Sequence, residues 1–107
     1  MPVPNSSLVY VIVWKYSVGE ATREDFEREY GPDGIWVKLF GRVAGYLGTE
    51  LLRGPAGVYL TIDRWESRAA YDTFLSLHAD EYNRIDQACA ALTLDETLIG
   101  AFGGQEE

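Results

Sequence analysis

The stretch from Val58 to Leu92 has the clearest pattern of hydrophobic and polar positions in the chain. Its first eight residues alternate, and successive side chains of a strand point to opposite faces. We therefore predict a strand whose one face is hydrocarbon, with Val58, Leu60 and Ile62. The opposite face combines rings with hydrogen-bonding groups: Tyr59, Thr61, Asp63 and Trp65.

Beyond Ser67 the pattern takes the period of a helix. Apolar and aromatic side chains recur every three or four residues as far as Leu92, which predicts one long helix with a single buried stripe. Ser67 supplies an N-cap hydroxyl, and we expect the helix to bend around residues 78–80. The stripe consists of Tyr71, Phe74, Leu75, His78, Tyr82, Ile85, Cys89 and Leu92.

The remaining patterns predict three further strands and an interrupted helix. Residues 8–14 form a continuous apolar run, typical of a central strand covered on both faces. Thr22 is the expected N-cap of a helix that residues 31–34 interrupt, because proline breaks the helical hydrogen bonding. That helix restarts over residues 35–43. The other expected elements are a strand at 46–53, a hairpin turn at 54–57 and a strand at 93–102.

This order of elements predicts the fold class. Strand, helix, strand, strand, helix, strand is the ferredoxin-like split βαβ arrangement, an α+β fold with a four-stranded antiparallel sheet. We expect one domain over residues 8–102, with loose termini at 1–7 and 103–107. Two helices cover only one face of such a sheet, yet the run 8–14 is apolar on both faces. We therefore expect a homodimer in which a second copy covers the open sheet face.

Charge and composition exclude several classes of partner. With 9 basic and 17 acidic residues the net charge is −8, which repels phosphate backbones and anionic membrane surfaces. No apolar run is long enough to span a bilayer, and the first residues lack the features of a secretion signal. We therefore expect a cytoplasmic protein that binds neither nucleic acid nor membrane.

Residue types also limit the chemistry. A single histidine, His78, and a single cysteine, Cys89, cannot build a zinc site, and Cys89 on the apolar stripe is expected to be an inert thiol. The glycines do not form either of the common phosphate-binding motifs. The sequence therefore predicts neither a metal nor a cofactor.

The candidate site is the space between the ring-bearing face of the strand and the helix stripe. It should suit a flat aromatic ligand, although the same rings could simply fill a core. His78 is a candidate general base because its ordinary pKa lies near neutral pH, and Asp63 is a second candidate if burial raises its pKa. His78 could equally be a structural residue. The candidate substrate-binding residues are Trp65, Tyr71, Phe74, Tyr82, Trp36, Tyr59 and Thr61, with Trp14 and Tyr16 as further aromatic candidates.

Several segments together resemble the antibiotic biosynthesis monooxygenase family: YVIVWKY, EDFEREYGPDGIW, GYLGTELL, YLTIDRWESRAAYDTF, EYNRIDQACAALT and ETLIGAF. The resemblance covers about residues 8–102 and implies a dimeric ferredoxin-like α+β barrel. Members of the family oxygenate anthrone-type polyketides or quinols without metal or flavin. Trp65 and Tyr71 match pocket positions used there, and Thr61 stands where those oxygenases have a strand asparagine.

Haem-degrading relatives in that family use an asparagine, a tryptophan and a histidine, whose places here hold Ile12, Phe74 and Arg84. Haem cleavage is therefore disfavoured. The leading hypothesis is a cofactor-independent monooxygenase that acts on a small aromatic or polyketide-like substrate. The alternatives are a non-catalytic small-ligand-binding module of the same fold and an isomerase.

Overall fold

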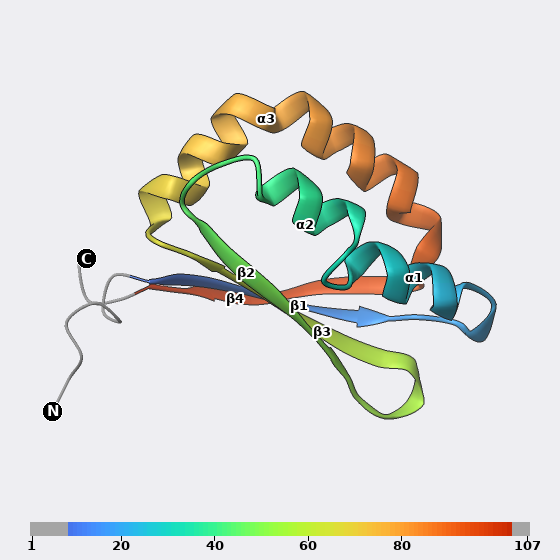
Figure 1. The fold of residues 1–107 in the computed structure, drawn as a ribbon. Coiled ribbons are helices and arrows are strands. Elements are labelled where there is room, and N and C mark those ends of the chain that lie inside the picture. The colour runs from blue at the N-terminus through green and yellow to red at the C-terminus, as the bar shows by residue number, and fades with distance from the viewer. Residues whose placement is uncertain (1–8, 104–107) are drawn as a thin grey trace, which may run out of the picture.

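The computed structural model describes residues 9–103 and has the predicted α+β architecture (Figure 1). The strands form one antiparallel sheet in the order β2-β3-β1-β4, and the helices lie together on one side of it. This is the ferredoxin-like split βαβ fold. The elements are β1 (Tyr10–Ser17), α1 (Arg23–Tyr30), α2 (Ile35–Phe40), β2 (Tyr46–Arg53), β3 (Val58–Trp65), α3 (Arg68–Cys89) and β4 (Asp95–Phe102).

β1 occupies the central position predicted for it, but its bounds differ from the expected residues 8–14. It runs from Tyr10 to Ser17, and Leu8 lies outside the described residues. The strand continues past Trp14 because β3 pairs with it over its full length, ending with Ser17 opposite Val58. Pairing across the sheet, which hydropathy along one segment does not reveal, therefore sets the end of this strand.

β3 turns its ring-bearing face towards the helices, as predicted. Its burial alternates strictly, and the buried positions are Tyr59, Thr61, Asp63 and Trp65. The hydrocarbon side chains of Val58, Leu60 and Ile62 are half-buried on the open face of the sheet. The two faces of this strand therefore meet different surroundings.

The first helical region differs from the prediction at two points. Thr22 does not cap α1; its Oγ1 instead donates a 2.9 Å hydrogen bond to the carbonyl oxygen of Leu92. α2 ends at Phe40, short of the expected Val43, because the chain turns there to enter β2. The expected break at 31–34 is present, and a Cβ added at Gly34 would lie only 2.1 Å from the carbonyl oxygen of Glu29.

The junction of β3 with α3 follows the prediction closely. Ser67 Oγ accepts a 3.1 Å hydrogen bond from the amide of Ala70, so Ser67 is the N-cap. His78 has φ −126° and ψ 27°, which breaks the helical geometry inside α3 at the expected bend. Gly45, just before β2, packs on the first turn of α3, and a Cβ there would lie 2.5 Å from Ala70 Cβ.

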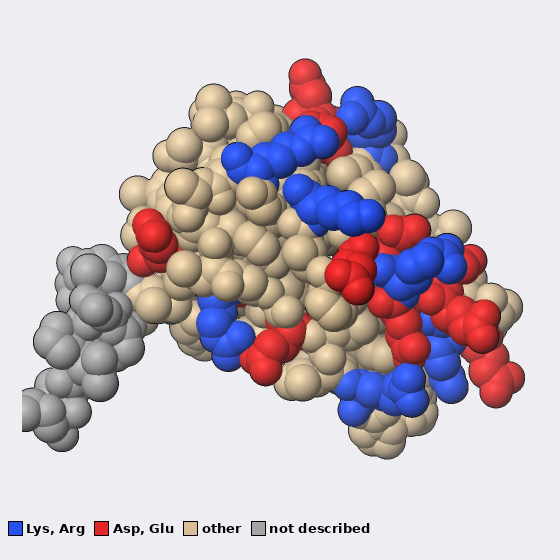
Figure 2. Space-filling view, viewed as in Figure 1, with Lys and Arg blue, Asp and Glu red and all other residues tan. Residues whose placement is uncertain are grey.

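Aromatic side chains dominate the interior between sheet and helices. The largest fully buried ones are Trp65, Tyr59, Phe26 and Phe74. On the outer surface, acidic and basic side chains lie next to one another over the α1 end of the face in Figure 2 rather than in patches of one sign. Within residues 9–103, no helix combines the length and the apolar character that a membrane span requires.

Candidate active site

A cavity of about 150 Å³ lies between the sheet and the helices. Both layers contribute to its walls, so it exists only because α1, α2 and α3 pack on one face of the sheet. From the helices come Tyr30, Trp36, Phe40, Tyr71, Tyr82 and Asp86. From the strands come Ile12, Trp14, Tyr16, Thr49, Thr61, Asp63 and Glu96.

The burial of these residues defines a deep part and an opening. Thr61 is 4% exposed and Asp63 is 8% exposed, so both lie in the deep part. Asp86 on α3 and Glu96 on β4 are the exposed members of the lining. The cavity therefore opens where the second half of α3 passes over β4, and two carboxyl groups stand at that opening.

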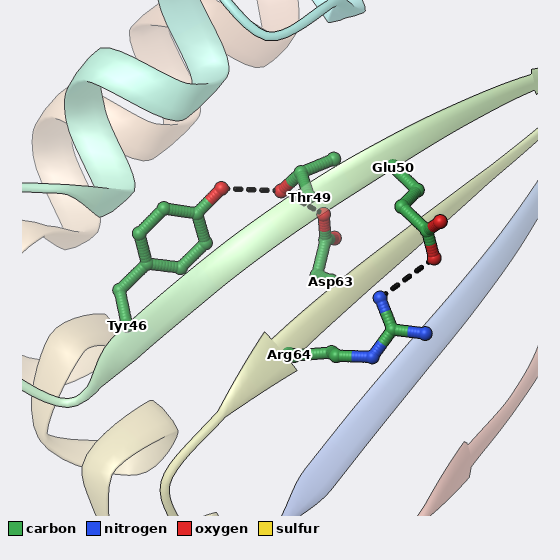
Figure 3. A network of polar contacts seen from close by, with 5 residues as sticks. All are labelled: Tyr46, Thr49, Glu50, Asp63 and Arg64. Atoms are coloured by element: carbon green, nitrogen blue, oxygen red, sulfur yellow. Dashed lines mark hydrogen bonds and ion pairs between the residues drawn. The ribbon is translucent and has the colours of Figure 1, made fainter.

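Asp63 is the most strongly perturbed acid of the cavity. Burial raises its pKa from the ordinary 3.8 to about 6, against the opposing effect of a hydrogen bond from Thr49. Thr49 Oγ1 donates to Asp63 Oδ1 at 2.7 Å, and the Tyr46 hydroxyl is hydrogen-bonded to Thr49 Oγ1 in turn (Figure 3). This chain fixes the orientation of the carboxyl group.

The residues next to Asp63 in the sequence lie on the opposite face of the sheet. Arg64 pairs with Glu50 at 2.7 Å, away from the cavity (Figure 3). The strand alternation thus keeps the nearest cation of β3 out of the site. Asp63 faces the cavity without a basic partner among the described residues.

Three tyrosines of the lining remain protonated at neutral pH. Burial is the main cause that raises the pKa values of Tyr16, Tyr30 and Tyr82 above the ordinary value of 10.0. The negative charges of Asp63 and Glu96 add to this effect at Tyr16 and Tyr82. These hydroxyl groups are therefore hydrogen-bond donors or acceptors rather than bases.

Trp36 adds a hydrogen-bond donor without a partner. Its side chain is 8% exposed, and its Nε1 is fully buried. The indole lies near the Tyr30 hydroxyl and the Cys89 thiol but makes no hydrogen bond of normal geometry with either. An unpaired buried N–H is costly, so a ligand oxygen that reached it would gain a hydrogen bond.

Seven of the candidate residues from the sequence lie together in the lining of the cavity: Asp63, Thr61, Trp36, Tyr71, Tyr82, Trp14 and Tyr16. Trp65 and Phe74 do not line it. Both are fully buried and pack against Phe40, with ring centroids 5.5 and 5.3 Å from it, so they support the wall from behind. Tyr59 is also buried, and its hydroxyl donates to Glu27.

His78 lies away from the cavity. It sits at the bend of α3 in a separate surface hollow with Ser76, Asp80 and Arg84 among its neighbours. Its ring contacts the back of the core through Phe74, at a centroid distance of 5.6 Å. The bend carries the side chain off the inward stripe, so the structure gives His78 no path to a ligand in the cavity.

Other lining residues were not among the candidates. Thr49 lies on β2 directly opposite Asp63, a pairing that depends on the register of the hairpin. Tyr30 and Phe40 come from helices distant in sequence from β3, and Asp86 and Glu96 are exposed acids with no distinguishing pattern. Periodicity did offer one signal: Tyr30 lies four residues after Phe26 on the inward face of α1. Among residues 9–103, no three His, Cys, Asp or Glu side chains come close enough together to hold a metal ion.

No protein-family model matches the chain, and no curated protein matches it. Several solved structures do have the same fold. The monooxygenase ActVA-Orf6 of Streptomyces coelicolor, solved in complex with nanaomycin D, superposes with a TM-score of 0.74 at 17% identity, covering 100% of this chain and 96% of that chain.

Two more solved structures have the same fold. SnoaB, a cofactor-independent oxygenase from Streptomyces nogalater, gives a TM-score of 0.65 at 19% identity over 92% of this chain and 95% of that one. A Nitrosomonas europaea protein assigned to the antibiotic biosynthesis monooxygenases gives 0.62 at 13% identity over 99% and 97%. These likenesses confirm the fold predicted from the sequence, that of the antibiotic biosynthesis monooxygenases.

Proposed function

We propose that the protein is a cofactor-independent monooxygenase of a small aromatic or polyketide-like substrate, with Asp63 as the general base. The observation that carries this proposal is the ring-lined cavity with one desolvated carboxyl in its deep part. A carboxyl with a pKa of about 6 is ionised at neutral pH, yet it is a stronger base than an ordinary aspartate. Two solved structures with this fold are of oxygenases, which supports the same reading.

In the proposed reaction, Asp63 takes a proton from the acidic C–H or O–H of an anthrone, phenol or hydroquinone. The resulting anion is electron-rich and transfers one electron to O₂, giving a substrate radical and superoxide. These two recombine by forming a C–O bond, and the peroxide then takes up the proton held by Asp63. Loss of water from the hydroperoxide leaves a carbonyl, so CH₂ and O₂ become C=O and H₂O.

The size of the cavity favours a small substrate. Its volume of about 150 Å³ is below the roughly 300 to 1,000 Å³ typical of ligand pockets. A cavity on the order of 150 Å³ is known to hold a single benzene ring. We therefore place one ring of the substrate between the sheet and helices, with any further group extending through the opening.

Oxygen uptake by the purified protein, in buffer with a metal chelator, tests this function on a panel of anthrones and hydroquinones. The wild-type rate should exceed the rate without protein and should rise with pH through about 6, because the ionised form of Asp63 is required. Asp63→Asn should lower turnover by about 10² to 10⁴. His78→Gln serves as the matched control and should leave turnover unchanged.

Two outcomes would contradict parts of the proposal. Uptake that survives Asp63→Asn but fails in His78→Gln would mean that the base is His78, despite its position outside the cavity. Tight binding of an aromatic ligand with no oxygen uptake across the panel would instead support the binding module.

We further propose that the protein is a homodimer through the open face of the sheet. Val11 and Val13 on β1 share that face with the apolar side chains of β3, and Phe102 of β4 lies opposite Val11. Leu52 is 43% exposed and Phe102 54% exposed within one chain. An apolar sheet face of this kind is stabilised when a second copy covers it.

Light scattering at micromolar concentration should therefore give twice the mass of one chain. Ile62→Glu places a charge at the centre of the open face, opposite Val13, and should shift the mass towards that of one chain. Leu77→Glu is the control, because Leu77 is 68% exposed on α3, on the helical side of the sheet. A monomeric wild-type protein would rule the dimer out.

A further inference from the structure

The distribution of charge around the cavity is one-sided. Its lining contains Asp63 in the deep part and Asp86 and Glu96 at the opening, and it contains no Lys, Arg or His among the described residues. Every other polar member is a hydroxyl or an indole. A ligand that carries a carboxylate would therefore enter a site with three acids and no counter-charge.

The acids at the opening have no ion-pair partner within residues 9–103. The ion pairs of that part of the chain use other carboxylates: Asp25, Glu27, Glu29, Glu50, Asp72 and Glu81. Arg84, only two residues before Asp86, pairs with Glu81 at 3.4 Å. Six of the nine basic side chains thus pair with other carboxylates, and the remaining three, Lys15, Arg23 and Lys38, make no ion pair with Asp86 or Glu96. The two carboxyls at the opening are therefore left for another cation.

The acids near Glu96 disfavour its charge. Partial burial raises the pKa of Glu96, and the neighbouring carboxylates of Asp86 and Asp95 raise it further. A cation between Asp86 and Glu96 would relieve this repulsion. Rings lie beside them in the lining, and the face of a tyrosine or tryptophan also attracts a cation.

We infer that the cavity selects a small aromatic ligand with a protonated amine, the ring lying in the deep part and the ammonium group between Asp86 and Glu96. This inference rests on the proposed function for the statement that the ligand is a substrate. It concerns binding alone, so it can be tested without turnover.

Three phenols that differ mainly in side-chain charge provide the probes: tyramine, which is cationic, tyrosol, which is neutral, and 4-hydroxyphenylacetate, which is anionic. Calorimetric titration of the full chain at low salt and neutral pH measures each affinity. Tyramine should bind roughly five- to tenfold more tightly than tyrosol, and the acid should bind more weakly than tyrosol. The preference should shrink as salt is added.

Removing the two charges identifies the residues responsible. The double variant Asp86→Asn, Glu96→Gln should bind tyramine and tyrosol within about twofold of each other, with tyrosol affinity retained. Asp80→Asn is the matched control, because Asp80 is an exposed acid of α3 outside the cavity lining, and it should keep the wild-type preference.

Several results would overturn the inference. They are equal affinity for tyramine and tyrosol in the wild type, tighter binding of the acid, no binding of any probe at millimolar concentration, or a tyramine preference that survives the double variant. Failure of the proposed function looks different. In that case tyramine binds with the expected preference, but the oxygen-uptake panel, extended to amine-bearing hydroquinones, shows no turnover.

Discussion

β3 and β4 are both eight-residue strands, and both pair with β1 in the same sheet. Their surroundings differ sharply. On β3 every second side chain is buried, and these positions include Asp63 and Thr61 of the cavity. On β4 nearly every side chain is exposed, including Leu98 and Ile99, each 50% exposed. Apolar residues in a strand are therefore not necessarily buried.

The difference comes from where the helices lie. They lie together on one side of the sheet (Figure 1), in which β3 and β1 are the two central strands and β4 is an edge strand beside β1. Glu96 on β4 shares that helix-side face with Tyr16, its partner across the ladder, and is left exposed at the opening. β4 thus contributes a residue to the opening of the cavity, whereas β3 supplies the polar groups of its deep part.

The largest expected effect on stability comes from truncating a buried side chain of β3. Trp65→Ala should lower the free energy of unfolding by about 3 to 5 kcal/mol, because a fully buried indole leaves a cavity that the core cannot close. Leu98→Ala on β4 should cost less than about 1 kcal/mol. Urea denaturation of both variants at one protein concentration measures the contrast. A loss above about 2 kcal/mol for Leu98→Ala would show that Leu98 is covered in solution.

The next effect has the opposite sign. The folded-state pKa of Asp63 is raised to about 6, so the folded protein holds this proton more tightly than the unfolded chain does. Stability is therefore lost as pH rises from about 4 through 6. Asp63→Asn should remove that loss and stabilise the protein by roughly 1 to 3 kcal/mol at pH 7.5. Near pH 4 the variant and the wild type should have similar stability.

Melting curves across that pH range check this prediction. Glu50→Gln is the control, since Glu50 lies on the open face in a pair with Arg64 and should give no such stabilisation. If Asp63→Asn destabilised the protein at pH 7.5, the ionised carboxyl would have to be stabilised in the fold by a charge or hydrogen bond in addition to that of Thr49.

A smaller effect is expected where β3 passes the chain to α3. Ser67→Ala removes the acceptor for the amide of Ala70 and should cost roughly 0.5 to 2 kcal/mol. The same substitution at Ser76, exposed inside α3, should be neutral or slightly stabilising because alanine is the better helix former. Equal denaturation midpoints for the two variants would mean that the cap contributes nothing to docking α3.

The smallest effect concerns the orientation of the base. Thr49→Val keeps the shape of the side chain but removes the hydrogen bond to Asp63, so it should raise the pKa of Asp63 further and cost about 1 kcal/mol. Thr49→Ser should restore the wild-type value. Carboxyl NMR of Asp63 during a pH titration measures the shift. A pKa that stays the same or falls in Thr49→Val would show that this bond does not favour the ionised form.

The parts of the fold that sequence predicted well are those that local patterns control. The alternation of β3, the cap at Ser67 and the bend at His78 depend on residues close together in the chain. The end of β1 depends on how far β3 runs beside it, and the loss of the Thr22 cap depends on Leu92, far away in sequence. Such contacts have no signature in a single segment.

The site was predictable to a similar extent and for the same reason. The faces of β3 and α3 placed Asp63, Thr61 and Tyr82 near the cavity. Whether a ring lines the cavity or packs behind its wall depends on how the helices are positioned over the sheet. The spacing of residues in the sequence therefore could not show that Trp36 lines the cavity and Trp65 does not. Asp86 and Glu96 meet at the opening only because α3 and β4 converge there.

The contact between Gly45 and Ala70 has a consequence for how this sequence can change over time. A methyl group at position 45 would collide with the methyl group already present at position 70, at 2.5 Å. Substitutions at the two positions are therefore coupled in evolution. A larger residue at position 45 is tolerated only in a chain whose position 70 has already become glycine. The order of such changes is constrained, although neither residue touches the cavity.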